Sequence, residues 1–217
     1  MSHVFRSPSQ ELIPLLAQRL SVLREAGEVL EYDFGGSFVN LIKQADHSAA
    51  RLVNLLVEHF PCFRDESNFY GKRVRFYKRA QILVADLWAC FNGEGYGQFD
   101  DIEALTIFAD YRIPQMLHSL GCLMYSPSLE SRIRRLATIE NGENCEIELR
   151  GNSIWCVESI RRHIVSQYPE AKNKVNAILI DFLLYDLCKE REREIEQAEM
   201  EVDDEMIPHH RTRSIWY

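Results

Sequence analysis

Hydrophobic residues recur at helical spacing along most of this 217-residue chain. Leucines between residues 12 and 30 fall near the period of a helix, and Phe34-Gly35-Gly36 interrupts their pattern. Ser37 and Ser48 each precede a new apolar stretch, and serine is a favoured residue at the start of a helix. The pattern therefore predicts a succession of helices before Pro61.

Helical spacing also dominates the rest of the chain. It predicts a long helix at Lys72–Phe91 and further helices at Ser153–Tyr168 and Lys174–Arg193. Residues 145–149 (CEIEL) alternate between apolar and charged positions, which predicts a short strand. The fold class is therefore mainly α. The length fits one large domain or two small ones, and we expect one domain over residues 1–217.

Charged residues dominate the chain after Asp186. Within the domain, residues 189–207 are predicted to be a charged linker or an extension of the preceding helix. The ending HRTRSIWY (His210–Tyr217) regains aromatic residues and cations. We therefore expect this tail to fold back onto the body of the protein.

Composition excludes several classes of protein. Asp and Glu total 33 against 25 Lys and Arg, and the net charge of −8 disfavours direct binding to nucleic acid. No apolar run approaches the ~18–20 residues that span a bilayer, and the first ten residues lack the apolar core of a signal peptide. The six cysteines form no CxxC pair and the histidines form no HExxH motif. We therefore expect a cytoplasmic protein with reduced thiols, no metal site, no cofactor and no membrane contact, with nuclear or mitochondrial pools as alternative locations.

Two carboxylates lie inside the apolar stretch at residues 177–187. A helix that is apolar all round is normally buried, and a buried charge must be paired or must face a cavity. Phe182 and Asp186 are four residues apart and share a helical face, and Asp181 lies beside them. One interpretation is a site for a planar base rich in hydrogen-bond donors. The other is a set of structural ion pairs or helix caps, and the sequence leaves both open.

Asp110 follows three apolar residues, 107–109. The local pattern favours an N-cap role for Asp110, before the helix that contains Pro114. The cations between residues 72 and 79 are interleaved with aromatic residues. They indicate either a phosphate-binding surface or a solvated helix face whose long side chains cover the core.

Several segments of the chain together resemble the queuosine salvage family. They are FGGSFVNLI (Phe34–Ile42), FYKRAQILVADLW (Phe76–Trp88), LTIFADYRIPQ (Leu105–Gln115), IWCVESIR (Ile154–Arg161), DFLLYD (Asp181–Asp186) and the ending HRTRSIWY (His210–Tyr217). Members of that family release the base queuine from queuosine 5′-phosphate, so that it can be reinserted into tRNA. The resemblance, which extends from about Val4 to Tyr217, implies an N-glycosyl hydrolase with a small nucleotide substrate. It also implies a helical fold similar to that of the helix-hairpin-helix DNA glycosylases.

The resemblance assigns roles to particular residues. It implies that Asp110 is the catalytic carboxylate, acting as a nucleophile or as a stabiliser of the cationic sugar. The base pocket would be lined by Phe108, Asp181, Phe182 and Asp186. Phe182 stands at a position where relatives carry tyrosine. The candidate contacts to the phosphate of the substrate are the cations Lys72, Lys78 and Arg112.

The resemblance also implies a shortened member of the family. Relatives carry a segment upstream of the point where this chain begins, and that segment contributes to the base pocket. The chain is therefore expected to be a monomeric hydrolase or, alternatively, a non-catalytic helical interaction protein or inactive short isoform. A DNA glycosylase would need a basic face for the duplex and a residue that wedges into the base stack, and the net charge of −8 argues against it.

Overall fold

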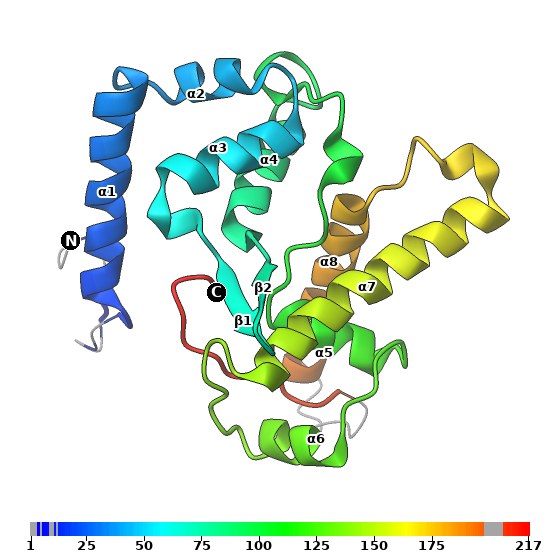
Figure 1. Ribbon diagram of the computed structural model, residues 1–217. Helices are drawn as coiled ribbons and strands as arrows, with labels where there is room; N and C mark the ends of the chain where they lie inside the picture. Colours follow the sequence, from blue (N-terminus) through cyan, green and yellow to red (C-terminus); the bar gives the residue numbers. More distant parts are fainter. Residues whose placement is uncertain (1–3, 5, 9–10, 12, 198–205) are drawn as a thin grey trace.

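A computed structural model describes residues 4, 6–8, 11, 13–197 and 206–217. The described part is mainly helical, as predicted, with one small two-stranded sheet (Figure 1). The α-helices are α1 (Leu16–Phe34), α2 (Phe38–Ala45), α3 (Ala49–His59), α4 (Lys78–Cys90), α5 (Arg112–Ser119), α6 (Pro127–Arg134), α7 (Asn144–Gln167) and α8 (Ala177–Gln197). Short 3-10 turns lie at Pro61–Phe63, Gly95–Gly97, Ile102–Ala104 and Pro169–Ala171.

Helices α1 to α4 form the first half of the molecule around one hydrophobic core. Helix α1 ends at Phe34, where Gly35 adopts a left-handed backbone with φ of 59°. Ser37 and Ser48 precede α2 and α3, as predicted, and the Ser48 hydroxyl accepts a hydrogen bond from the third residue of α3. Leu41 and Leu52 are fully buried where these helices meet. The breaks and starts of these helices therefore follow local sequence signals.

Helices α5, α7 and α8 pack against one another in the second half. The connection to this half is the segment 105–110, which precedes α5 without helical or strand structure of its own. Phe108 packs into the core of the first half, whereas Ile107 packs into the core formed by α5, α7 and α8. The segment therefore runs between the two cores, and Asp110 lies at its end.

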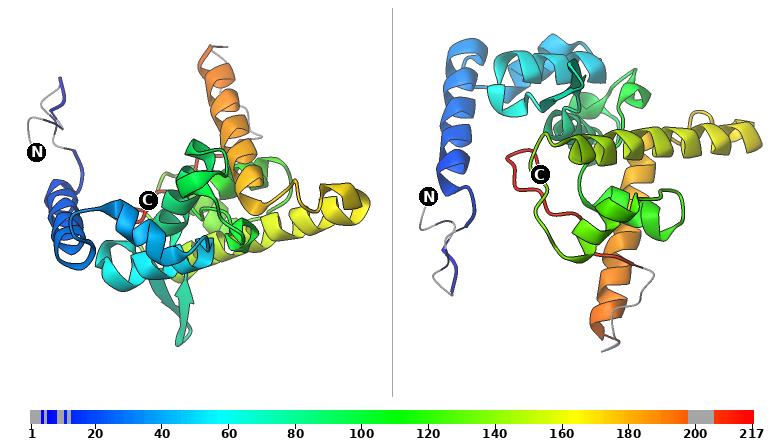
Figure 2. Two further views of the ribbon diagram at one scale, coloured as in Figure 1. Left: turned by 90° about the horizontal axis from the view of Figure 1, so that it is seen from above. Right: turned by 60° about the horizontal axis from the view of Figure 1, so that its bottom comes forward.

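The predicted helix at Lys72–Phe91 is wrong at its beginning. Residues 66–75 form an antiparallel hairpin of β1 (Glu66–Phe69) and β2 (Lys72–Arg75), which projects from the body in Figure 2. The two residues between the strands, Tyr70 and Gly71, have φ values of 48° and 80°, which suit a tight hairpin turn. Helix α4 then begins only at Lys78.

The predicted strand at residues 145–149 is also wrong, because this segment is the first turn and a half of α7. The buried residues of α7 include Glu146, Leu149, Arg150 and Ser153, which repeat at helical spacing. Glu146 is completely buried although it is charged. The alternation failed as a signal because a paired carboxylate occupies the core face of the helix.

The C-terminal tail does return to the body, as predicted. Helix α8 continues to Gln197, so residues 189–197 extend the helix, whereas residues 198–205 lie outside the described part. Beyond them, the backbone carbonyl of Arg211 accepts a hydrogen bond from the Ile139 N–H at 2.8 Å, and the Tyr217 ring is half buried. No helix in the described part of the chain is long and apolar enough to cross a membrane.

Candidate active site

Three elements bring charged side chains together at the boundary between the two cores. The first turn of α4 carries Lys78, the end of the connecting segment carries Asp110, and α8 carries Asp181. Lys78 and Asp181 are buried, and the side chain of Asp110 is 15% exposed. The geometry therefore unites residues that are up to 103 positions apart in the sequence (181 − 78).

The two oxygens of the Asp110 carboxylate have different surroundings. Oδ1 accepts hydrogen bonds from the backbone N–H groups of Arg112 and Ile113, at 2.8 and 3.2 Å, where α5 begins. Oδ2 lies 3.8 Å from the Lys78 Nζ atom. Asp110 thus caps α5, as predicted, but from one residue before the N-cap position, which Tyr111 occupies without a side-chain cap bond. This capping holds the carboxylate in an orientation that leaves Oδ2 directed at the lysine.

Lys78 is held from its backbone as well as from its side chain. Its N–H donates to the Asp65 carboxylate at 3.1 Å, and this bond satisfies a free N–H at the start of α4. Burial lowers the pKa of the Lys78 ammonium, whereas the nearby Asp110 acts in the opposite direction. Lys78 is therefore a desolvated cation directed at one carboxylate oxygen.

Asp181 is the buried acid of α8. Its Oδ2 accepts a hydrogen bond from the Phe108 backbone N–H at 2.9 Å. Burial raises the pKa of the Asp181 carboxyl to about 7; the bond from Phe108 opposes this effect and the charge of Asp110 adds to it. Asp181 therefore exchanges its proton close to neutral pH.

Aromatic rings lie beside Asp181. The rings of Phe108 and Phe182 are tilted by 53°, with their centroids 6.2 Å apart. Phe182 is half buried, whereas Asp186 is exposed one turn further along α8. The structure thus brings Phe108, Asp181 and Phe182 together, and it places Asp186 in solvent.

The segment that leads to Asp110 is clamped at successive residues. The Gln81 side chain accepts from the Thr106 N–H at 2.8 Å, and Asp181 holds the N–H of Phe108. The Arg150 guanidinium then donates from Nε to the Ala109 carbonyl at 2.9 Å. An irregular segment with this many fixed backbone groups holds its terminal side chain in one place.

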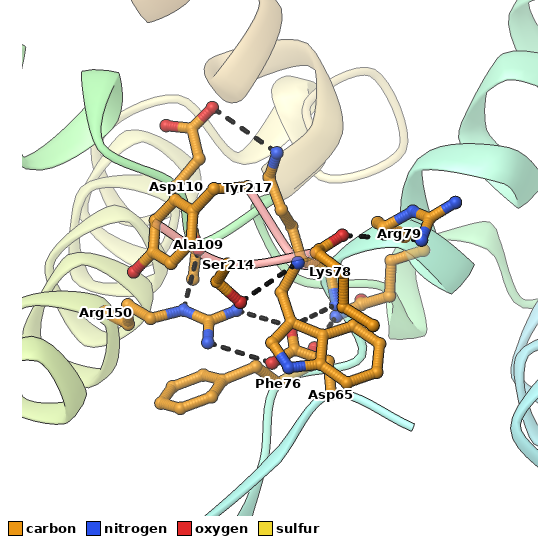
Figure 3. Close-up of polar contacts among 12 residues, drawn as sticks. Asp65, Phe76, Lys78, Arg79, Ala109, Asp110, Arg150, Ser214 and Tyr217 are labelled. Atoms are coloured by element: carbon orange, nitrogen blue, oxygen red, sulfur yellow. Dashed lines mark hydrogen bonds and ion pairs between the residues drawn. The ribbon is translucent and has the colours of Figure 1, made fainter. Parts of the chain in front are cut away.

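Arg150 lies at the centre of a buried network, shown with the Lys78–Asp110 pair in Figure 3. The guanidinium contacts both oxygens of Asp65, and its Nη1 lies 3.4 Å from Glu146. The Tyr217 hydroxyl donates to Glu146 at 2.5 Å. Neither Glu146 nor Arg150 was predicted from the sequence, because a strand was expected there. Their i,i+4 spacing, with opposite charges inside apolar text, was the signal that could have revealed them.

A groove of about 380 Å³ opens beside Lys78. Its lining combines aromatic residues of the C-terminal tail and of the 3-10 turn at Pro61–Phe63 with cations, aliphatic residues and one acid of α4: Phe63, Lys78, Arg79, Ile82, Leu83, Asp86, Trp216 and Tyr217. Arg79 lies 5.3 Å from the centroid of the Phe63 ring. The groove therefore offers flat apolar surfaces, with the cations Lys78 and Arg79 and the acid Asp86 in its lining.

The other two predicted phosphate contacts lie in different surroundings. The Arg112 guanidinium is bound to Glu192, lies 3.8 Å from the Cys188 sulfur and stacks over Tyr111. Lys72 is exposed at the first position of β2, beside the hairpin turn. Of the three predicted cations, Lys78 is the one whose charged group faces Asp110.

Comparison with known proteins gives consistent matches over the chain. Residues 1–217 match the family described as queuosine salvage protein. A mouse protein named queuosine 5′-phosphate N-glycosylase/hydrolase is 42% identical over 99% of this chain and 62% of its own length. Proteins of the same name from Schizosaccharomyces pombe and Sphaerobacter thermophilus are 45% and 43% identical, over 100% and 94% of this chain. The chain spans about three fifths of the length of these relatives.

Proposed function

This chain belongs to the queuosine salvage protein family, and we propose that it hydrolyses the N-glycosidic bond of queuosine 5′-phosphate to release queuine. Support for the reaction comes from the names of relatives that match nearly the whole chain. Support from the structure comes from the Asp110 carboxylate. Its Oδ1 is held at the start of α5 while its Oδ2 faces Lys78 beside a groove.

The proposed chemistry centres on charge at the sugar. As the bond between the anomeric carbon and the base nitrogen breaks, both electrons leave with the base and the ribose becomes cationic. Asp110 stabilises that cation or attacks it, and a fixed carboxylate in a partly desolvated site is effective in either role. Water supplies the oxygen that finally bonds to the anomeric carbon, and its proton balances the charge of the departing base.

The base half of the substrate is assigned to α8 and the connecting segment. Queuine is a 7-deazapurine, so protonation at the seven position cannot assist its departure. Hydrogen bonds to the leaving base therefore matter more. Asp181 provides a polar group that is bound to the Phe108 backbone N–H, the rings of Phe108 and Phe182 provide apolar surface, and Asp186 is a further acceptor at the solvent side.

Lys78 is the proposed contact for the 5′-phosphate. Its ammonium is buried and lies 3.8 Å from the Asp110 carboxylate, and Lys78 is one of the residues that line the groove. A desolvated cation binds a phosphate oxygen through a charge-assisted hydrogen bond. Arg112 is committed to Glu192, and Lys72 is exposed on the hairpin, so neither is retained as a phosphate contact in this proposal.

The direct test is release of queuine. Folded protein is incubated with queuosine 5′-phosphate, and free queuine is measured by chromatography. We expect activity from the wild type and a loss of roughly 10²–10³-fold in Asp110→Asn, since a positioned charge-stabilising group contributes about that much. Asparagine retains an oxygen that can accept from the start of α5. Asp101→Asn is the matched control, because Asp101 similarly accepts from N–H groups at the start of α3.

The outcomes separate the alternatives. If folded wild-type protein releases no queuine, the proposal that the chain is a hydrolase is overturned. The alternative, a non-catalytic helical interaction protein, is then favoured. If Asp110→Asn is as active as the wild type, the proposed catalytic role of Asp110 is wrong, whereas the proposed reaction is retained.

The remaining expectations stand as parts of this proposal. They are a single domain over residues 1–217, a scaffold similar to helix-hairpin-helix DNA glycosylases, a monomeric state and a cytoplasmic location. The net charge of −8 supports a free nucleotide, rather than a nucleic acid, as the binding partner.

A further inference from the structure

We infer that Arg150 is a positioning residue for the proposed hydrolysis: through the Ala109 carbonyl and the Asp65 carboxylate it sets the geometry of Asp110 and Lys78. The inference rests on the proposed function, since it concerns the same pair of residues. It assigns a role to a side chain that lies in neither the sugar site nor the base site.

The first step is that Arg150 has a single orientation. Its side chain is fully buried, in a helix that supplies Glu146 one turn earlier. The guanidinium carbon lies 3.9 Å from the centroid of the Phe76 ring and 5.2 Å from that of Tyr217. With rings against the group, its N–H donors are directed within their own plane, at Asp65, Glu146 and a backbone carbonyl.

The second step is that this plane reaches Asp110. The Nε atom donates to the Ala109 carbonyl at 2.9 Å, and the Ala109 carbonyl belongs to the peptide that leads into Asp110. A rotation of that peptide would displace the Asp110 carboxylate relative to the start of α5 and to Lys78. Displacements of about 1 Å in a catalytic group can cost roughly 10²-fold in rate.

The third step is that the same network reaches Lys78. Asp65 binds the Arg150 guanidinium with both oxygens, and its Oδ2 also accepts the Lys78 backbone N–H at 3.1 Å. The Asp65 carbonyl in turn accepts from the N–H groups of Phe76 and Tyr77. One arginine thus aligns the backbone before Asp110 and, through Asp65, the backbone of Lys78.

A merely structural ion pair would need only opposite charges, and this difference can be tested with lysine. Arg150→Lys keeps the positive charge beside Asp65 and Glu146, but its single ammonium cannot bind both Asp65 oxygens and the Ala109 carbonyl in one plane. We expect kcat to fall roughly 10–100-fold, while KM for queuosine 5′-phosphate changes less than about threefold. We also expect Arg150→Lys combined with Asp110→Asn to be no slower than Asp110→Asn alone, because the two residues act as a unit.

Arg132→Lys is the matched control. Arg132 also binds both oxygens of one glutamate, Glu143, and donates to one backbone carbonyl, that of Thr138 at 3.2 Å. The Thr138 carbonyl is remote in sequence from Asp110. Arg132 is partly exposed, whereas Arg150 is buried. We expect Arg132→Lys to retain kcat within about twofold of the wild type, which would show that loss of a two-oxygen contact to a carboxylate does not by itself lower kcat.

Asp65→Asn is the second variant. If Arg150→Lys does not fold, the kinetics of Asp65→Asn alone test the inference. Asparagine keeps the size of the side chain and one acceptor oxygen, but it cannot bind the Arg150 guanidinium with two charged oxygens. We expect the same fall in kcat, together with a rise in KM smaller than the one expected for loss of Lys78 itself, because Asp65 also holds the Lys78 backbone N–H. Folded Arg150→Lys or Asp65→Asn with wild-type kcat would overturn the inference, as would a loss confined to KM. If the wild type itself releases no queuine, the proposed function fails and the inference fails with it. An active wild type together with an equal kcat in Arg150→Lys would overturn the inference and leave the proposed function in place.

Discussion

Replacing Asp181 with asparagine should make the stability of the protein less sensitive to pH. Burial raises the pKa of this carboxyl from 3.8 to about 7, and the Phe108 N–H and Lys78 only partly oppose that effect. The folded state therefore binds a proton that the unfolded chain has released over most of this range. The sign follows directly: the contribution of Asp181 is full below pH 3.8 and is lost as pH rises through 7.

The magnitude follows from the same two values. Each pH unit between them lowers the free energy of unfolding by about 1.4 kcal/mol, so the total loss is about 4 kcal/mol. Between pH 5 and pH 8 the wild type should lose about 3 kcal/mol through this residue. Asp181→Asn has no such titration, and its amide oxygen can still accept from the Phe108 N–H at the same place.

The assay is urea unfolding of both proteins at several pH values between 5 and 8. The difference in the free energy of unfolding, variant minus wild type, should rise by about 3 kcal/mol over this range. Asp186→Asn is the control for replacing a carboxylate of the same helix, because Asp186 is exposed. A constant difference for Asp181→Asn would refute the reasoning, because it would mean that Asp181 holds no extra proton in the folded state.

Two further predictions concern other charged groups. Asp101 accepts from the Ser48 hydroxyl at 2.7 Å and from the N–H of Ala49 at 2.5 Å, so Asp101→Ala should lower the free energy of unfolding by ~1–2 kcal/mol in urea titrations. A change below about 0.3 kcal/mol would show that water replaces this cap without cost. Lys78→Met should raise KM for queuosine 5′-phosphate roughly 10–100-fold, as expected for a lost charge-assisted hydrogen bond, and should change KM for the unphosphorylated nucleoside much less. Equal effects on the two substrates in steady-state assays would argue that Lys78 does not bind the phosphate.

Local signals in the sequence were sufficient for much of the helical framework. The break after Phe34 and the helix starts at Ser37 and Ser48 were predicted correctly, because each depends on residues within one turn of the chain. The hairpin at residues 66–75 was missed, although its Tyr70-Gly71 turn was a local signal for it. In that segment the high density of cations and aromatic residues suggested a helix face instead.

The start of α4 depended on a contact that is distant in the sequence. Helix α4 begins at Lys78 because the Asp65 carboxylate, 13 residues earlier, accepts the Lys78 N–H. Tyr77, which precedes the helix, has a φ of 51° and supplies no cap from its own side chain. A propensity pattern cannot show such a start, because the capping group comes from a different element.

The candidate site shows the same division between sequence and tertiary structure. The sequence by itself determined which acids stand out: Asp110 after an apolar segment, and Asp181 and Asp186 inside an apolar helix. Only the tertiary structure decided that Asp110 caps α5 with one oxygen and faces Lys78 with the other. It also decided that Asp181 is buried and Asp186 exposed, since α8 turns these two side chains to different sides.

The role of Arg150 depends almost entirely on tertiary structure. Its partners Ala109 and Asp65 are 41 and 85 residues away, and the Tyr217–Glu146 contact spans 71 residues. Burial of the Glu146 and Arg150 charges is favourable only because these partners arrive together. A window of neighbouring residues contains these charges but none of their distant partners. The sequence therefore determined which residues are available for the site, and the packing of the two halves determined how they are arranged.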